Sequence, residues 1–137
     1  MSTSKSRNLP VLTARIALGL IYFVFGLNFF LHFIPNSGQP EGKAAAFLGG
    51  LFQSGYLFPV LKTVEVIAGV LLLLGFYTPL VLVILMPISL NIFLFHSFLE
   101  PSGFAIVLSG FIIFLQLFLA WVYRNQYRQL FVARPAL

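Results

Sequence analysis

The sequence predicts an all-α integral membrane four-helix bundle, with a short surface helix in the first outer loop. Composition is the first observation behind this prediction, because 60% of the 137 residues are hydrophobic and only 8% are charged. A soluble domain of this size could not bury so much apolar surface, so lipid must be its main solvent. The second observation is a set of four apolar segments of about 20 residues, the length that crosses the hydrocarbon core of a bilayer.

One transmembrane domain is expected over residues 1–137. Its spans are predicted at about 11–34, 58–77, 79–98 and 103–123. The first segment follows basic residues, as in a signal peptide, but it is too long for one and no small-residue cleavage site follows it. Gly75 and Pro79 end the second span and begin the third, which predicts a tight turn there.

The basic residues predict the orientation in the membrane. Six of the eight lie near the two ends of the sequence: Lys5, Arg7, Arg15, Arg124, Arg128 and Arg134. Four spans place both termini on one side, and the positive-inside rule makes that side cytoplasmic. Lys43 and Lys62 then lie on the outer side, where they count against the assignment but are outnumbered.

The segment 35–57 is the one sizeable stretch expected outside the membrane. It opens with a cluster of turn-forming residues at 35–40. An Ala run and four apolar side chains follow, and they predict a short helix over 41–52 that lies on the outer surface or re-enters slightly. The alternative is a plain connector with a helical kink.

Glu65 is the most informative polar residue, because a carboxylate within a spanning helix costs roughly 2.5–3.5 kcal/mol on insertion scales. From the rise of a helix, Glu65 lies roughly 12 Å from the outer end of its span, and Asn91 lies roughly 10 Å from the outer end of the next. Asn28 has a similar depth on the first span. Lys62 lies one helical turn before Glu65, and His96 is nearer the outer surface. The sequence therefore predicts a ligand site formed by Glu65, Asn91, Asn28, Lys62 and His96.

Each of these residues also has a structural interpretation. Lys62 is expected either to extend toward the interface or to form an ion pair with Glu65. Asn28 and Asn91 can tie helices together by hydrogen bonds, and His96 is compatible with the water interface. Glu65 is predicted to face the bundle interior and to be satisfied by one of these four neighbours, because an unpaired carboxylate in lipid is too costly.

Small residues on three of the spans predict tight packing, because they let helix backbones approach closely. They are Gly19 and Gly26 on the first, and Ala68 and Gly69 on the second, with Gly110 on the fourth. Pro87 is expected to kink the third span near Asn91 and to widen the bundle opposite Glu65. Seventeen Phe residues supply bulky walls that suit a flat aromatic ligand or contact with lipid.

Several chemistries are excluded or unsupported by the sequence. The chain has no cysteine, so disulfides, thiolate catalysis and Cys-ligated metals or clusters cannot occur. No metal or nucleotide motif is present, and the basic residues form no continuous patch for nucleic acid. A haem held by two histidines would need both His32 and His96.

The chain resembles the DoxX family of small four-helix bacterial membrane proteins over residues 15–123. The resemblance is carried by ARIALG at 14–19, FGLN at 25–28, GY at 55–56, KTVEV at 62–66, GVLLLLG at 69–75, TP at 78–79, and by Pro87, Asn91 and His96. It implies a four-helix bundle in the bacterial cytoplasmic (inner) membrane, linked to membrane oxidoreductase complexes. Named relatives are associated with a thiosulfate–quinone oxidoreductase.

The predicted function is therefore a membrane subunit of an oxidoreductase or quinone-linked complex, without catalytic activity of its own. A quinone is the expected non-covalent cofactor. Expected partners are the lipid bilayer and a membrane or membrane-associated protein, with a homo-oligomer also compatible. Two alternatives stay open: a structural membrane subunit without a redox role, and a small proton-coupled transporter that uses Glu65.

Overall fold

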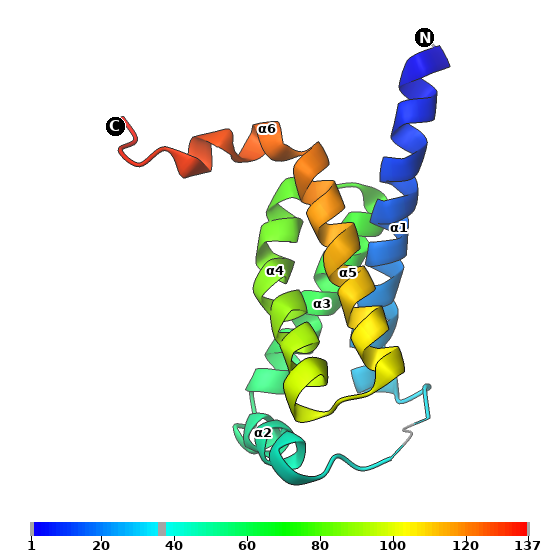
Figure 1. Cartoon of the computed structure of the whole chain (residues 1–137), viewed down its shortest axis with the longest axis vertical. Coiled ribbons are helices and arrows are strands. Elements are labelled where there is room, and N and C mark those ends of the chain that lie inside the picture. The colour runs from blue at the N-terminus through cyan, green and yellow to red at the C-terminus, as the bar shows by residue number, and fades with distance from the viewer. Residues whose placement is uncertain (1, 36–37, 137) are drawn as a thin grey trace.

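The computed structural model describes residues 2–35 and 38–136, with side chains described from residue 8 onward. Its five main helices are α1 (Ser2–Leu31), α2 (Gly42–Gln53), α3 (Leu57–Leu74), α4 (Thr78–Leu94) and α5 (Gly103–Val122). The four long helices form one bundle, and α2 crosses one end of it (Figure 1). The predicted all-α bundle with a short helix in the first loop is confirmed. Two turn residues predicted at 36–37 and the side chains of Lys5 and Arg7 lie outside the described residues.

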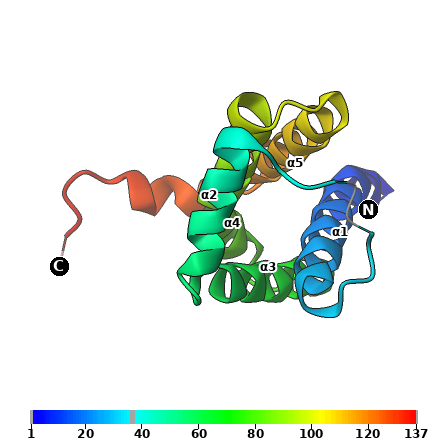
Figure 2. The same cartoon turned by 90° about the horizontal axis from the view of Figure 1, so that it is seen from below.

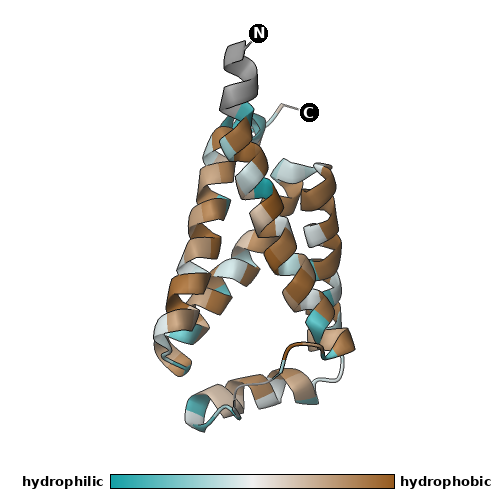
Figure 3. Ribbon diagram, turned by 90° about the vertical axis from the view of Figure 1, so that its right-hand side faces the viewer, coloured by the Kyte–Doolittle hydropathy of each residue, from teal (hydrophilic) through white to brown (hydrophobic). Residues whose placement is uncertain are grey.

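Four helical segments are long and apolar enough to cross a membrane. They are Asn8–Leu31, Leu57–Leu74, Thr78–Leu99 and Gly103–Val122. The first ends at Leu31, three residues earlier than the sequence predicted, because His32 takes a left-handed conformation with a φ of 51°. The third continues past α4 through a π-helix, η1 (Phe95–Leu99). Most residues of the four long helices are apolar, as expected of helices that face lipid (Figure 3).

The two termini lie at one end of the bundle, called here the terminal end, and α2 lies at the other, called the α2 end (Figure 1). This arrangement agrees with the four-span topology. Beyond α5, the short helix α6 (Arg124–Tyr127) is tied back to the bundle, because the Tyr127 hydroxyl donates to the Pro79 carbonyl at 2.7 Å. Burial, followed by the neighbouring Tyr123, raises the pKa of Tyr127 above its usual value. The hydroxyl therefore stays protonated and able to donate.

Helices α1 and α3 pack backbone against backbone through glycines. A Cβ atom at Gly69 would lie 2.6 Å from the Phe23 nitrogen and 2.8 Å from the Gly19 carbonyl oxygen. At Gly26 it would lie 2.9 Å from a Val66 methyl carbon. Real Cβ atoms do not approach other atoms so closely, so only glycine permits this spacing. The predicted close approach of backbones is confirmed at Gly19, Gly26 and Gly69, whereas Gly110 makes only an ordinary contact, 3.7 Å from Phe93.

The core lies toward the terminal end of the bundle. Its largest fully buried apolar side chains are Leu18, Leu72, Leu82, Leu85 and Leu119. The turn from α3 to α4 closes this end, with Gly75 in the left-handed conformation at a φ of 80° and its N–H bonded to the Leu71 carbonyl at 2.8 Å. The Arg15 side chain covers this glycine, and a Cβ there would collide with its guanidinium group. Arg15 thus places its positive charge at the C-terminus of α3, where the helix dipole favours a cation.

Candidate functional site

A cavity of about 420 Å³ occupies the bundle toward the α2 end. All four long helices line it, together with α2 and the π-helix η1. Viewed from the α2 end, α2 crosses in front of α3 and α4 (Figure 2). The polar residues that line the cavity are Tyr22, Lys62, Glu65, Asn91, His96 and Ser109. This volume falls within the range of small-molecule sites, and such sites combine apolar walls with a few polar groups.

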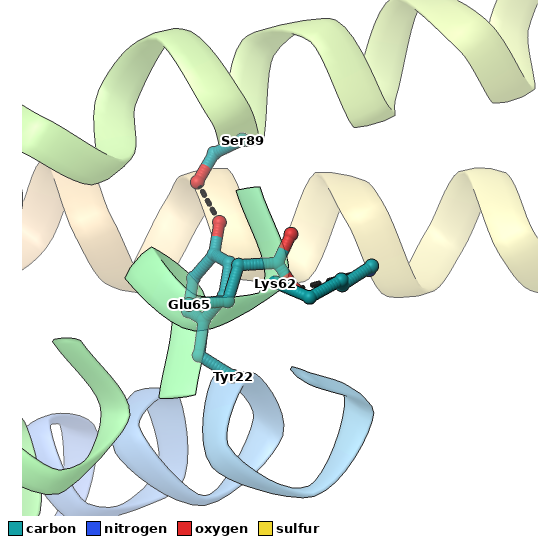
Figure 4. Close-up of polar contacts among 4 residues, drawn as sticks. All are labelled: Tyr22, Lys62, Glu65 and Ser89. Atoms are coloured by element: carbon teal, nitrogen blue, oxygen red, sulfur yellow. Dashed lines mark hydrogen bonds and ion pairs between the residues drawn. The ribbon is translucent and has the colours of Figure 1, made fainter. Parts of the chain in front are cut away.

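Glu65 and Lys62 form an ion pair at the wall of this cavity. Nζ of Lys62 donates to Oε2 of Glu65 at 3.1 Å, and the two residues are one helical turn apart on α3. The exposed fraction is 2% for the Glu65 side chain and 20% for that of Lys62, so the carboxylate is the deeper member. The prediction that Glu65 faces the interior and is satisfied by a predicted neighbour is confirmed for Lys62. Figure 4 shows this pair beside the hydrogen bond between Tyr22 and Ser89.

The carboxylate of Glu65 is only half satisfied. Its Oε1 atom is buried and has no hydrogen-bond partner among the described residues. The position of this group follows from the packing of α1 on α3, because a Cβ at Gly26 would lie 3.2 Å from Cβ of Glu65. The stem of Glu65 is thus covered by the α1 backbone while its head reaches the cavity. A buried acceptor without a partner is costly unless a water or a ligand completes it.

Asn91 and His96 approach the cavity from α4 and η1. Asn91 is exposed overall, although it lines the cavity. The Nδ1 atom of His96 is buried and, within the described part of the chain, has no partner. The helix α4 runs through Pro87 to Leu94, and the backbone changes to π-helix at Phe95, one turn after Asn91. π-Helical turns often occur at functional sites, and this one carries His96.

Asn28 does not line the cavity, which corrects the expected convergence of three helices at one depth. Its side-chain Oδ1 accepts a hydrogen bond from the backbone N–H of Ile34 at 2.7 Å. Its backbone carbonyl oxygen accepts one from the backbone N–H of His32 at 2.8 Å. Asn28 therefore completes the turn that ends α1, a structural use of its amide. His32 is exposed and also lies outside the cavity lining, so the two histidines are not brought together there.

Aromatic rings hold α2 against the bundle at this end of the cavity. Phe52 of α2 stacks on Phe58 of α3 with ring centroids 4.2 Å apart, and Phe29 of α1 stacks on Phe58 at 5.8 Å. Phe47 of α2 packs on Phe95 of η1 at 5.8 Å. The helix α2 is therefore held by α3 and by η1, and its apolar side chains contribute to the cavity wall.

Comparison with known proteins identifies the family of the chain. A model of the DoxX family matches residues 11–97. The chain belongs to the DoxX family. The matched region includes Lys62, Glu65, Asn91 and His96, whereas α5 lies beyond it. The chain matches no curated protein and no solved structure.

A second polar group in this DoxX protein was not predicted as a site from its sequence. Tyr22 of α1 and Ser89 of α4 are hydrogen-bonded, Ser89 donates to Oε1 of Gln116 on α5, and Nε2 of Gln116 donates to the Leu82 carbonyl at 2.9 Å. Because the Ser89 proton is used on Gln116, Tyr22 must be the donor to Ser89. These three side chains are fully buried, and their hydrogen bonds join three helices. The only sequence signal for this group was that Tyr22, Ser89 and Gln116 are polar residues within apolar spans, where such side chains often bond to another helix.

Proposed function

We propose that this DoxX protein is a quinone-binding membrane subunit of an oxidoreductase, with the quinone ring in the cavity at the α2 end. The observation that carries the proposal is Oε1 of Glu65, a buried acceptor that faces the cavity with no partner among the described residues. Intramembrane carboxylates mark ligand or proton pathways by default, because burial without a use is too costly.

The cavity lining fits the chemistry of a quinone. A quinone is a flat ring with carbonyl oxygens at opposite edges, and when bound it supplies two-electron, two-proton redox chemistry. The Phe-rich walls match the faces of the ring. Nζ of Lys62 and the amide of Asn91 can donate to carbonyl oxygens, and the two buried unpartnered atoms, Oε1 of Glu65 and Nδ1 of His96, can accept or hold a proton.

The cavity also suits a ligand that arrives from the bilayer. Phe25 of α1 and Phe104 of α5 both line it and have exposed fractions of 43% and 79%. These two helices edge the cavity where it opens toward lipid. Electrons would come from a membrane or membrane-associated partner protein, because this chain has no cysteine to bind a cluster. With the terminal end in the cytoplasm, as the Lys/Arg distribution favours, the quinone lies in the outer half of the inner membrane.

The test is Glu65→Gln in purified protein, with a quinone that lacks a long tail as the titrated ligand and thermal stabilisation as the readout. Glutamine keeps the shape and can still accept from Lys62, so the melting temperature without ligand should change little. The Kd should rise by about tenfold for the reduced form of this quinone, because its hydroxyl group can donate to Oε1 of Glu65 and that charged hydrogen bond is replaced in the variant. Glu100→Gln is the matched control, since Glu100 is exposed near the same end and does not line the cavity.

Two results would replace this proposal. Unchanged quinone affinity in folded Glu65→Gln protein would make Glu65 and Lys62 a structural ion pair in a scaffold subunit. Proton-coupled uptake into proteoliposomes that depends on Glu65, without quinone binding, would identify a transporter instead.

A further inference from the structure

A second hollow lies between α1 and α5, nearer the terminal end. It is an open groove of about 490 Å³. On α1 it is lined by small residues that include Thr13, Ala14 and Ala17, and on α5 by the large rings of Phe111, Phe114 and Phe118. Small side chains on one helix therefore form the floor of the groove, and aromatic side chains on the other form its wall.

The groove and the quinone cavity lie end to end along one seam. On α1, Ala17 lines the groove and Ile21, one turn later, lines the cavity. On α5, Phe111 lines the groove and Leu108, one turn earlier, lines the cavity. Residues three or four apart share a helix face, so a single stripe of each helix lines both hollows. From Ile21 to Leu9 at the far end of the groove, twelve residues span about 18 Å.

The groove offers no hydrogen-bonding group. Its one hydroxyl belongs to Thr13, and that hydroxyl donates to the Leu9 carbonyl of its own helix at 2.8 Å. The polar residues are thus in the cavity and the apolar surface is in the groove. This division matches an amphipathic molecule with a polar head and a hydrocarbon tail.

We propose that the groove holds the hydrocarbon tail of the ligand whose head occupies the cavity, so that the ligand is a long-tailed lipid-soluble quinone. The inference rests on the proposed function, since it needs the head group to bind near Glu65. The positions of the two hollows fit this arrangement. A molecule whose head lies in the cavity at the α2 end would extend its tail past the middle of the bundle toward the groove at the terminal end. Lipid is as apolar as the groove, so the hydrophobic effect does not favour binding of the tail. Van der Waals packing of the tail against the groove does.

The first test blocks the groove with Thr13→Phe and compares a long-tailed quinone with one that lacks the tail. Thr13 is exposed and its hydroxyl contacts only its own helix, so the variant should fold. The Kd for the long-tailed quinone should rise by about threefold or more, because the added ring occupies the packing space of the tail. The Kd for the tail-less quinone should not change. Leu12→Phe is the control, since Leu12 is also exposed and lines neither hollow.

The second test uses wild-type protein and a quinone with a photoreactive group at the end of its tail. Mass spectrometry of the labelled peptides should place the adduct within 9–17 of α1 or 111–118 of α5, and excess unlabelled long-tailed quinone should remove it. Labelling elsewhere, with normal binding of the head, would overturn the tail site and leave the quinone cavity intact. No binding of either quinone would overturn both. Labelling of the groove by phospholipid acyl chains, undiminished by quinone, would assign the groove to bulk lipid.

Discussion

The two sides of α1 are built in opposite ways. Toward α3, the backbones touch at Gly19 and Gly69, and even one added methyl group would collide. Toward α5, the same helix leaves a cavity of about 420 Å³ and a groove of about 490 Å³. The α1–α3 interface is called here the closed side and the α1–α5 seam the open side.

The difference shows how one helix can serve both stability and binding. In a membrane, helices associate by packing, so glycine contacts hold the closed side without any hydrophobic driving force. On the open side, Phe rings of α5 line the groove, and α1 and α5 are joined through Tyr22, Ser89 and Gln116. The closed side therefore fixes the position of Glu65, and the open side leaves the cavity that Glu65 lines.

The largest expected effect is from Gly69→Leu on the closed side. Because a Cβ there would lie 2.6 Å from backbone of α1, the two helices must separate. The free energy of unfolding should fall by about 3 kcal/mol, the upper end of the cost of overpacking. Unfolding in detergent, followed by circular dichroism, measures the change. Gly110→Ala is the control, since its Cβ would make an ordinary 3.7 Å contact and stability should be kept. Equal tolerance at both glycines would show that α1 and α3 are not in backbone contact.

An intermediate effect is expected from Gln116→Leu, which breaks the hydrogen bonds across the open side. Ser89 would lose its acceptor and Tyr22 would be bonded to a serine without a further partner. We expect a loss of about 1–2 kcal/mol in unfolding free energy, as for buried polar groups in membrane helices. Binding of a tail-less quinone should change less than in Glu65→Gln. A tenfold loss of quinone affinity in the folded variant would mean that this network belongs to the ligand site.

The smallest effect on stability is expected from Thr13→Phe on the open side. The groove has room for the ring, and the Thr13 hydroxyl bonds only to its own helix. The free energy of unfolding should change by no more than about 0.5 kcal/mol, as at other surface positions. Chemical unfolding of the variant beside Gly69→Leu tests the contrast directly. A loss of more than about 2 kcal/mol would show that α1 and α5 pack tightly where the groove is placed.

The sequence was sufficient to predict the glycines of the closed side and, in the candidate site, the Lys62–Glu65 pair. Gly19, Gly26 and Gly69 were recognisable because small residues recurring on one face predict close packing. The Lys62–Glu65 pair was recognisable because both residues lie on one helix, where spacing along the chain fixes proximity. These predictions needed only helical periodicity and length.

The remainder depended on how helices distant in sequence are rotated toward each other. Depth along the membrane placed Asn28 level with Glu65, but depth does not give the direction of a side chain around the helix, and Asn28 turned to the end of α1. Tyr22, Ser89 and Gln116 come from three helices, and nothing in the local sequence pairs them. The groove is defined by facing stripes of α1 and α5, which only the packed bundle brings together.

The most direct test of the account uses a membrane-soluble carbodiimide on the protein in lipid vesicles. The reagent adds to the Glu65 carboxyl group as an acylisourea, and Nζ of Lys62, 3.1 Å away, attacks the acyl carbon once it has lost its proton. An amide forms, the reagent leaves as a urea, and the protein loses the elements of one water. The chain has only three acidic residues, so the exposed Glu41 and Glu100 serve as internal controls for reaction in water. We predict that the Lys62–Glu65 crosslink forms from the bilayer, is absent in Glu65→Gln and is suppressed by excess quinone. A crosslink that forms equally fast with saturating quinone, or no crosslink at all, would contradict a quinone site at Glu65 that is open to the membrane.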